Sequence, residues 1–207
     1  MPHGPIVVEL FTSQGCSSCP PADRLLAQLA DDGRVAPLSF HVDYWDELGW
    51  VDPYAKPAWT QRQRVYAKAL GDDRVYTPEL VVGGKTGMVG SNKSQVTSAI
   101  GRAEPPALLA ATSVWKDGKF EVTTTAPEGA DVWIAIYEQK AANKVPRGEN
   151  AGETLESTHV VRMLERVAVA GKRGSLSLAV DPTWKNVGAL AFAQRADRTI
   201  VASVVLR

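Results

Sequence analysis

The hydrophobic pattern of this chain changes its period at residues 104–107, Glu-Pro-Pro-Ala, and this change constrains the fold most. Before it, strand-like and helix-like segments follow one another. After it, apolar residues recur at every second position, as they do in β-strands. Because two consecutive prolines interrupt regular backbone structure, we expect a domain boundary there. The predicted domains are residues 1–106 and 107–207, which suits a chain of 207 residues.

The first domain is predicted to be an α/β unit with the element order βαβαββα. We expect strands at residues 6–13, 35–43, 74–82 and 86–89, and helices at residues 16–30, 60–70 and 91–101. Ser17 and Ser18 are expected to cap the first helix, and Thr60 the second. Strands separated by helices predict parallel pairs, whereas Gly83-Gly84 predicts an antiparallel hairpin. The sheet is therefore expected to be mixed.

The second domain is predicted to be all-β. Its alternating pattern indicates about seven short strands with almost no helix. They are expected within residues 113–125, which contain the hairpin signal Asp-Gly, and at 132–137, 158–169, 175–180, 189–194 and 199–206. This spacing is typical of a small antiparallel β-sandwich.

The composition excludes two classes of partner. Lys and Arg total 23, as do Asp and Glu, so no net charge attracts nucleic acid. No apolar run approaches the about 20 residues that span a bilayer. The first residues lack the basic and apolar stretches of a secretion signal. We expect a cytoplasmic protein if the chain is complete as given, and a periplasmic or secreted one if a leader has been removed.

The chain has two cysteines, Cys16 and Cys19, in the sequence Cys-Ser-Ser-Cys between the first strand and the first helix. One helical turn brings two such sulfur atoms within disulfide distance. Backbone N–H groups at a helix N-terminus stabilise a thiolate and lower the pKa of the first cysteine. We therefore expect Cys16, the more exposed, to attack a substrate, and Cys19 to resolve the mixed disulfide. The alternative is a short structural disulfide or two buried thiols.

Three further residues are candidates for this site. Thr77-Pro78 precedes the third strand, and a cis peptide bond there would turn the Thr77 backbone outward to bind an extended substrate. Glu9, in the first strand, is a candidate proton shuttle if its side chain turns inward. His41, in the second strand, is a candidate third ligand if the thiolates hold a metal.

Several segments resemble a known family. They are VELFTSQGCSSCPPAD at residues 8–23, HVDYW at 41–45, GWVDP at 49–53, YTP at 76–78 and RGEN at 147–150. These segments resemble the DUF1223 family, a bacterial group with a thioredoxin-like domain, and the likeness covers nearly the whole chain. The resemblance implies a thioredoxin-like fold and thiol chemistry without naming a substrate. Members often carry a secretion signal, which implies a periplasmic or secreted location.

Three functions remain open at this stage. The first is a thiol–disulfide oxidoreductase that acts on a protein or small-molecule thiol or disulfide and needs no organic cofactor, because its own sulfurs hold the electrons. The second is a Cu- or Zn-binding module or metallochaperone built on Cys16, Cys19 and His41. The third is a binding protein whose Cys pair is inert.

Two loops also have alternative interpretations. The tryptophans at positions 45, 50 and 59 either form core or line a groove for an apolar substrate. The loop at residues 147–150 either docks near the Cys pair or only connects two strands. The acids at positions 43, 46, 47 and 52 match no hard-metal loop, so we expect turn and cap roles for them.

Overall fold

The computed structural model describes residues 2–72 and 74–206; Met1 and Arg207, the outermost residues of the two expected domains, lie outside the described residues. The first half contains β1 (Ile6–Thr12), α1 (Pro20–Ala30), β2 (Val35–His41), the 3-10 helix η1 (Asp46–Leu48), α2 (Pro57–Leu70), β3 (Glu79–Val82), β4 (Thr86–Val89) and α3 (Lys93–Arg102). The second half contains β5 (Ala107–Leu108), β6 (Ala111–Lys116), β7 (Lys119–Thr125), β8 (Ala130–Lys144), β9 (Thr154–Ala168), β10 (Arg173–Ala179), β11 (Val187–Arg195) and β12 (Ile200–Leu206). The expected βαβαββα order is present in the first half.

The start of α1 lies later than predicted. The helix begins at Pro20 rather than at Cys16, and Cys19 is its N-cap residue. Ser17 and Ser18 therefore lie in the turn before the helix and do not cap it. The reason is that Pro20 has no N–H to donate to the carbonyl of Cys16, so a regular helix cannot extend further back.

Two more predicted boundaries were wrong, and a proline residue sets the actual boundary in each case. The helix α2 begins at Pro57, which occupies its first turn, so Lys56 rather than Thr60 is the N-cap residue. The hydroxyl of Thr60 instead hydrogen-bonds the carboxylate of Asp43. Strand β3 begins only at Glu79, because the preceding proline cannot donate to a β-ladder.

The strands of the first half form one end of a nine-stranded mixed sheet with the order β4-β3-β1-β2-β9-β8-β11-β12-β5. Strands β1 and β2 are parallel, as expected across α1. Strand β3 is antiparallel to β1, so the expectation that helices separate only parallel strands was wrong here. Because β3 runs opposite to β2, the connection through η1 and α2 begins and ends at the same end of the sheet.

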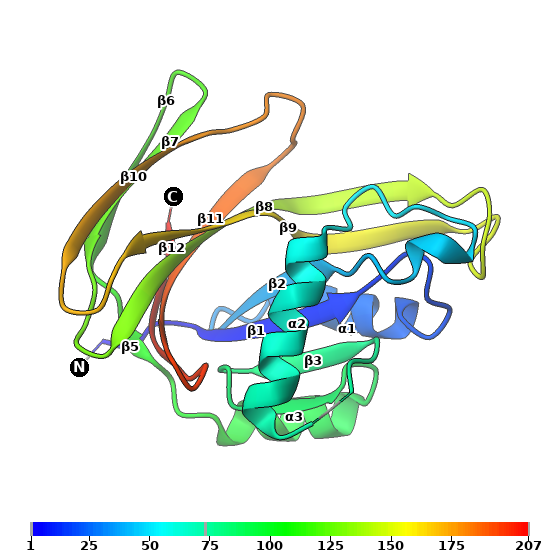
Figure 1. Ribbon diagram of the computed structural model, residues 1–207, viewed down its shortest axis with the longest axis horizontal. Coiled ribbons are helices and arrows are strands. Elements are labelled where there is room, and N and C mark those ends of the chain that lie inside the picture. The colour runs from blue at the N-terminus through cyan, green and yellow to red at the C-terminus, as the bar shows by residue number, and fades with distance from the viewer. Residues whose placement is uncertain (1, 73, 207) are drawn as a thin grey trace.

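The main sheet continues across the expected domain boundary. Strands β8 and β9 are each 15 residues long and form a curled hairpin that joins the first half through a parallel pair, Ser39 with Val160. Figure 1 shows these two strands running the length of the molecule. A second, antiparallel sheet has the order β10-β7-β6. The fold is therefore a large curled mixed sheet with a separate antiparallel sheet, and the β-sandwich remains a prediction.

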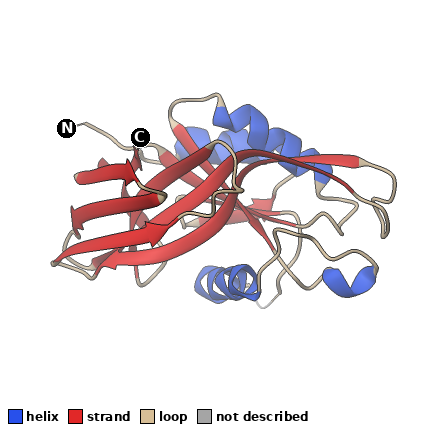
Figure 2. Cartoon of the chain, turned by 90° about the horizontal axis from the view of Figure 1, so that it is seen from above, coloured by secondary structure: helices blue, strands red, loops and turns tan. Residues whose placement is uncertain are grey.

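Three groups of buried side chains hold these layers together. One lies between the sheet and the helices α1 and α3, and includes Leu10 and Leu26. A second contains Trp59 and Tyr66 of α2 together with Phe192 of β11, so it is shared by the two halves. The third lies between strands of the two sheets. Figure 2 shows the helices on both sides of the main sheet. Among the described residues, no helix is long and apolar enough to span a membrane.

Candidate functional site

The two cysteines form a disulfide bond at the N-terminus of α1. Their Cα atoms are 5.5 Å apart, and both residues are fully buried. The expectation that Cys16 is the more exposed was therefore wrong. Its sulfur lies 3.3 Å from the hydroxyl of Ser18 and 3.9 Å from the carbonyl oxygen of Thr77, which cover it. Because Ser18 is itself exposed, this small side chain separates the Cys16 sulfur from solvent.

The peptide bond between Thr77 and Pro78 is cis, as predicted, and it lies beside the disulfide. The indole N–H of Trp45 donates to the hydroxyl of Thr77 over 2.8 Å. The indole N–H of Trp50 donates to the side-chain oxygen of Gln14, two residues before Cys16. These two tryptophans are half-buried around the Cys pair, whereas Trp59 belongs to the core.

The loop at residues 147–150 docks against the Cys pair. The carboxylate of Glu149 accepts a hydrogen bond of 3.0 Å from the backbone N–H of Ser17. The side-chain amide of Asn150 donates to the carbonyl oxygens of Gln14 and Cys16, at 2.9 Å and 3.0 Å. In Figure 1 this loop, which follows β8, lies next to the segment that contains η1. The β8–β9 hairpin therefore brings the second half of the chain to the disulfide.

A partly buried carboxylate that the sequence analysis missed lies in α1, one helical turn after Cys19. Asp23 follows Cys19 by four residues, and its backbone N–H donates to the Cys19 carbonyl. Burial raises the pKa of Asp23 to about 7, although His41 and a hydrogen bond from Thr12 act in the opposite direction. Asp23 follows Cys19 by one helical turn and lies next to the apolar Ala22. This spacing was a sequence signal that could have identified Asp23 as a site residue.

His41 and Asp52 form a buried ion pair near Asp23. The Nδ1 atom of His41 lies 2.7 Å from a carboxylate oxygen of Asp52, which also accepts from the backbone N–H of Gln14. Burial alone lowers the pKa of His41, but the Asp52 carboxylate raises it above its usual value. Burial alone raises the pKa of Asp52, but His41 lowers it below its usual value. Within the described part of the chain, Nε2 of His41 and Oδ1 of Asp23 are buried without a hydrogen-bond partner.

The structure places Glu9 away from the cysteines. Its carboxylate accepts hydrogen bonds from Arg62 and Tyr66 of α2, with one Arg62 contact at 3.0 Å. Glu9 lies in β1 between Val7 and Phe11, which face α2, whereas α1 packs on the other face of the sheet. Cys19 is the N-cap residue of α1. The strand alternation thus gives Glu9 a buried ion pair in the core and does not bring it to Cys19.

The candidate metal ligands do not form a cluster. Within residues 2–72 and 74–206, no three His, Cys, Asp or Glu side chains are arranged to hold a metal ion. The Nδ1 atom of His41 is hydrogen-bonded to Asp52, and the sulfurs of Cys16 and Cys19 are joined in a disulfide bond.

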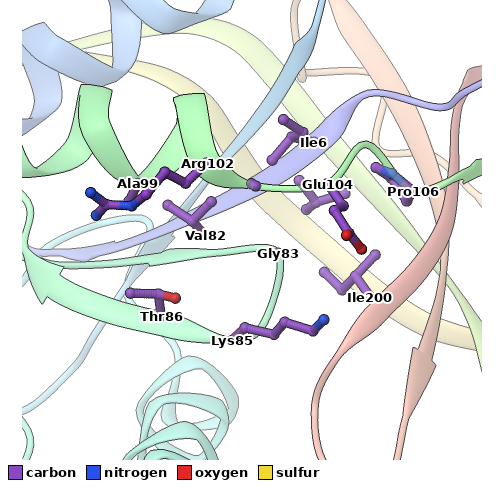
Figure 3. A pocket seen from close by; sticks show the side chains of 12 residues that line it. Ile6, Val82, Gly83, Lys85, Thr86, Ala99, Arg102, Glu104, Pro106 and Ile200 are labelled. Atoms are coloured by element: carbon purple, nitrogen blue, oxygen red, sulfur yellow. The ribbon is translucent and has the colours of Figure 1, made fainter.

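A cavity of about 370 Å³ lies apart from the Cys pair (Figure 3). It is bounded by the β3–β4 hairpin, the end of α3 and the start of β12. The residues that line it include the apolar Ile6, Val82 and Ile200 and the charged Lys85 and Glu104. The described residues that line it include no cysteine.

Comparisons with known proteins place this site in a family. Residues 7–194 match the family described as "Protein of unknown function (DUF1223)". The chain belongs to the DUF1223 family. A crystal structure of a protein from Agrobacterium tumefaciens is similar, with a TM-score of 0.77 and 30% sequence identity over 100% of this chain and 95% of that one. No curated protein matches. The DUF1223 match spans the disulfide and the loop that docks on it, so both belong to the family region.

Proposed function

We propose that this DUF1223 protein is a thiol–disulfide oxidoreductase whose first half is a thioredoxin-like unit. The observation that carries the proposal is the Cys16–Cys19 disulfide at the start of α1, beside the Thr77–Pro78 segment. The βαβαββα order, with the Cys pair directly after the first strand, supports the thioredoxin-like part. The substrate is a disulfide or dithiol of a protein or a small molecule.

The proposed reaction begins with the reduced pair. The thiolate of Cys16 attacks one sulfur of the substrate disulfide, forms a mixed disulfide and releases the other substrate sulfur as a thiolate. The thiolate of Cys19 then attacks the sulfur of Cys16, which releases the second substrate thiol and forms the Cys16–Cys19 disulfide. Two electrons pass from the pair to the substrate, and the same steps in reverse oxidise a substrate dithiol. No organic cofactor takes part in these steps.

Asp23 is the proposed proton acceptor for Cys19. A thiol must lose its proton before it attacks, and a nearby base with a pKa near the working pH serves this step best. Burial raises the pKa of Asp23 to about 7, so its carboxylate takes up and returns a proton at neutral pH. Asp23 also lies in the first turn of α1, whose N-cap residue is Cys19.

The substrate is proposed to approach over the turn at Ser17 and Ser18. Both residues are exposed, and the Ser18 hydroxyl contacts both the Cys16 sulfur and the Thr77 carbonyl. Displacing this hydroxyl uncovers the sulfur and frees the Thr77 carbonyl to accept a hydrogen bond from an extended substrate.

Capture of a mixed disulfide tests the proposal. We expect Cys19→Ala, incubated with oxidised glutathione, to gain one glutathione on Cys16, because no second thiol releases it. Cys16→Ala is the matched control and should gain much less in the same time. Intact mass spectrometry reads both. Failure of Cys19→Ala to form an adduct, while remaining folded by circular dichroism, would contradict the proposed function.

A further inference from the structure

We propose that Glu149, from the loop after β8, restrains formation of the Cys16 thiolate and so favours the disulfide form of the pair. The inference rests on the proposed function and deepens it: the second half of the chain tunes the redox pair of the first. Glu149 acts as a positioning residue, because its carboxylate contacts the backbone next to Cys16 rather than the substrate.

The start of α1 offers a thiolate few hydrogen-bond donors. Backbone N–H groups at a helix N-terminus normally stabilise a cysteine thiolate, but Pro20 and Pro21 have none. The N–H of Cys19 donates to the carbonyl of Cys16. The N–H of Ser17 donates to the Glu149 carboxylate, which therefore occupies a donor adjacent to Cys16.

The residues before and after Glu149 in the chain hold it in this position. The preceding Gly148 has a φ of 86°, and a Cβ atom there would lie 3.3 Å from the Cβ of Trp50, so the close approach requires glycine. The following Asn150 is buried and donates to the carbonyl oxygens of Gln14 and Cys16. An exposed glutamate would otherwise be free to turn into solvent.

The charge of Glu149 opposes a second negative charge at Cys16. Hydrogen bonds from the side chain and backbone of Ser17 lower the pKa of the Glu149 carboxyl, so it is ionised at neutral pH. Asp23, His41 and Asp52 are titratable side chains that also lie near the pair, and they are unaltered when position 149 is changed.

Glu149→Gln removes the charge and keeps an oxygen that can accept from Ser17. In a Cys19→Ala background, where Cys16 is the remaining thiol, we expect the variant to react with iodoacetamide at pH 7 about threefold faster, the size of effect that one exposed charge exerts through a water-like dielectric. With both cysteines present, its equilibrium with the glutathione couple should shift towards the dithiol. Glu149→Asp should restore part of the original behaviour, and Glu153→Gln, an exposed acid in the same loop, should change neither readout.

Unchanged or slower alkylation in Glu149→Gln overturns the inference, as does an equal effect of Glu153→Gln. Alkylation needs only chemically reduced protein, so this result is independent of the exchange reaction. Failure of the parent protein to exchange with glutathione would instead count against the proposed function.

Discussion

Replacing Asp23 by asparagine should stabilise the protein at alkaline pH. Burial raises the pKa of Asp23 from 3.8 to about 7, so the folded state binds a proton that the unfolded state has already lost between these values. The free energy of unfolding of the parent protein therefore decreases as pH rises through this window. The substituted asparagine side chain stays neutral and has a similar shape, so it does not carry this cost.

The size of this stability difference follows from the same rise in the pKa of Asp23. Each pKa unit corresponds to about 1.4 kcal/mol, so the ionised Asp23 costs about 4 kcal/mol at pH 8, where the carboxyl is ionised in both states. Near pH 4, where the folded-state carboxyl is protonated, the parent and the Asp23→Asn variant should differ little. The difference between them should open progressively between about pH 4 and pH 7.

Urea unfolding of the oxidised proteins, followed by tryptophan fluorescence from about pH 4.5 to about pH 8.5, measures this difference across the window that the shifted pKa defines. Asp31→Asn is a matched control, because Asp31 is an exposed acid at the other end of the same helix. We expect its curve to run parallel to that of the parent. In the reduced proteins, Asp23→Asn should also slow closure of the mixed disulfide at neutral pH, because Cys19 loses its proton acceptor.

A constant stability difference across the pH range would refute this reasoning about Asp23. So would destabilisation by Asp23→Asn at pH 8, since that would mean that the buried carboxylate is stabilised by its neighbours rather than penalised by burial.

Two further substitutions test buried polar contacts, one in the core and one at the site. Arg62→Met should lower the free energy of unfolding by about 3–5 kcal/mol, because it leaves the buried carboxylate of Glu9 without its counter-charge; a loss below about 1 kcal/mol in urea unfolding would contradict this. Asn150→Ala should cost about 1–3 kcal/mol, because the buried carbonyl of Gln14 loses its side-chain donor and that of Cys16 is left with the Cys19 N–H. Asn150→Ala should also increase hydrogen exchange at the Ser17 amide. Unchanged exchange there would contradict the inference that Asn150 holds Glu149 against Ser17.

The local parts of the site were predictable from the sequence. The Cys pair, the cis bond before Pro78 and the strand–turn–helix context depend on residues close together in the chain. The exact start of α1 was missed because the helix was predicted to begin at Cys16, with Pro20 within its first turn, whereas the helix begins at Pro20 itself.

The remaining parts depend on contacts between distant segments. The alternation of β1 did not reveal which face of the sheet Glu9 would occupy, and α2 supplied the buried arginine that pairs with it. The loop with Glu149 reaches Ser17 across 132 residues of chain, and a local pattern contains no information about such a contact. Likewise, the pairing of Ser39 with Val160 joined the main sheet across the expected boundary.

The rate of glutathione capture tests the central claim most directly, namely that Cys16 is the attacking sulfur and Cys19 the resolving one. Reduced Cys19→Ala and Cys16→Ala should be compared with oxidised glutathione at the same pH and concentration. The proposed function predicts at least about tenfold faster capture by Cys19→Ala, because the Cys16 sulfur lies beneath the exposed Ser18 side chain, where the substrate is proposed to approach. Equal rates, or faster capture by Cys16→Ala, would contradict it.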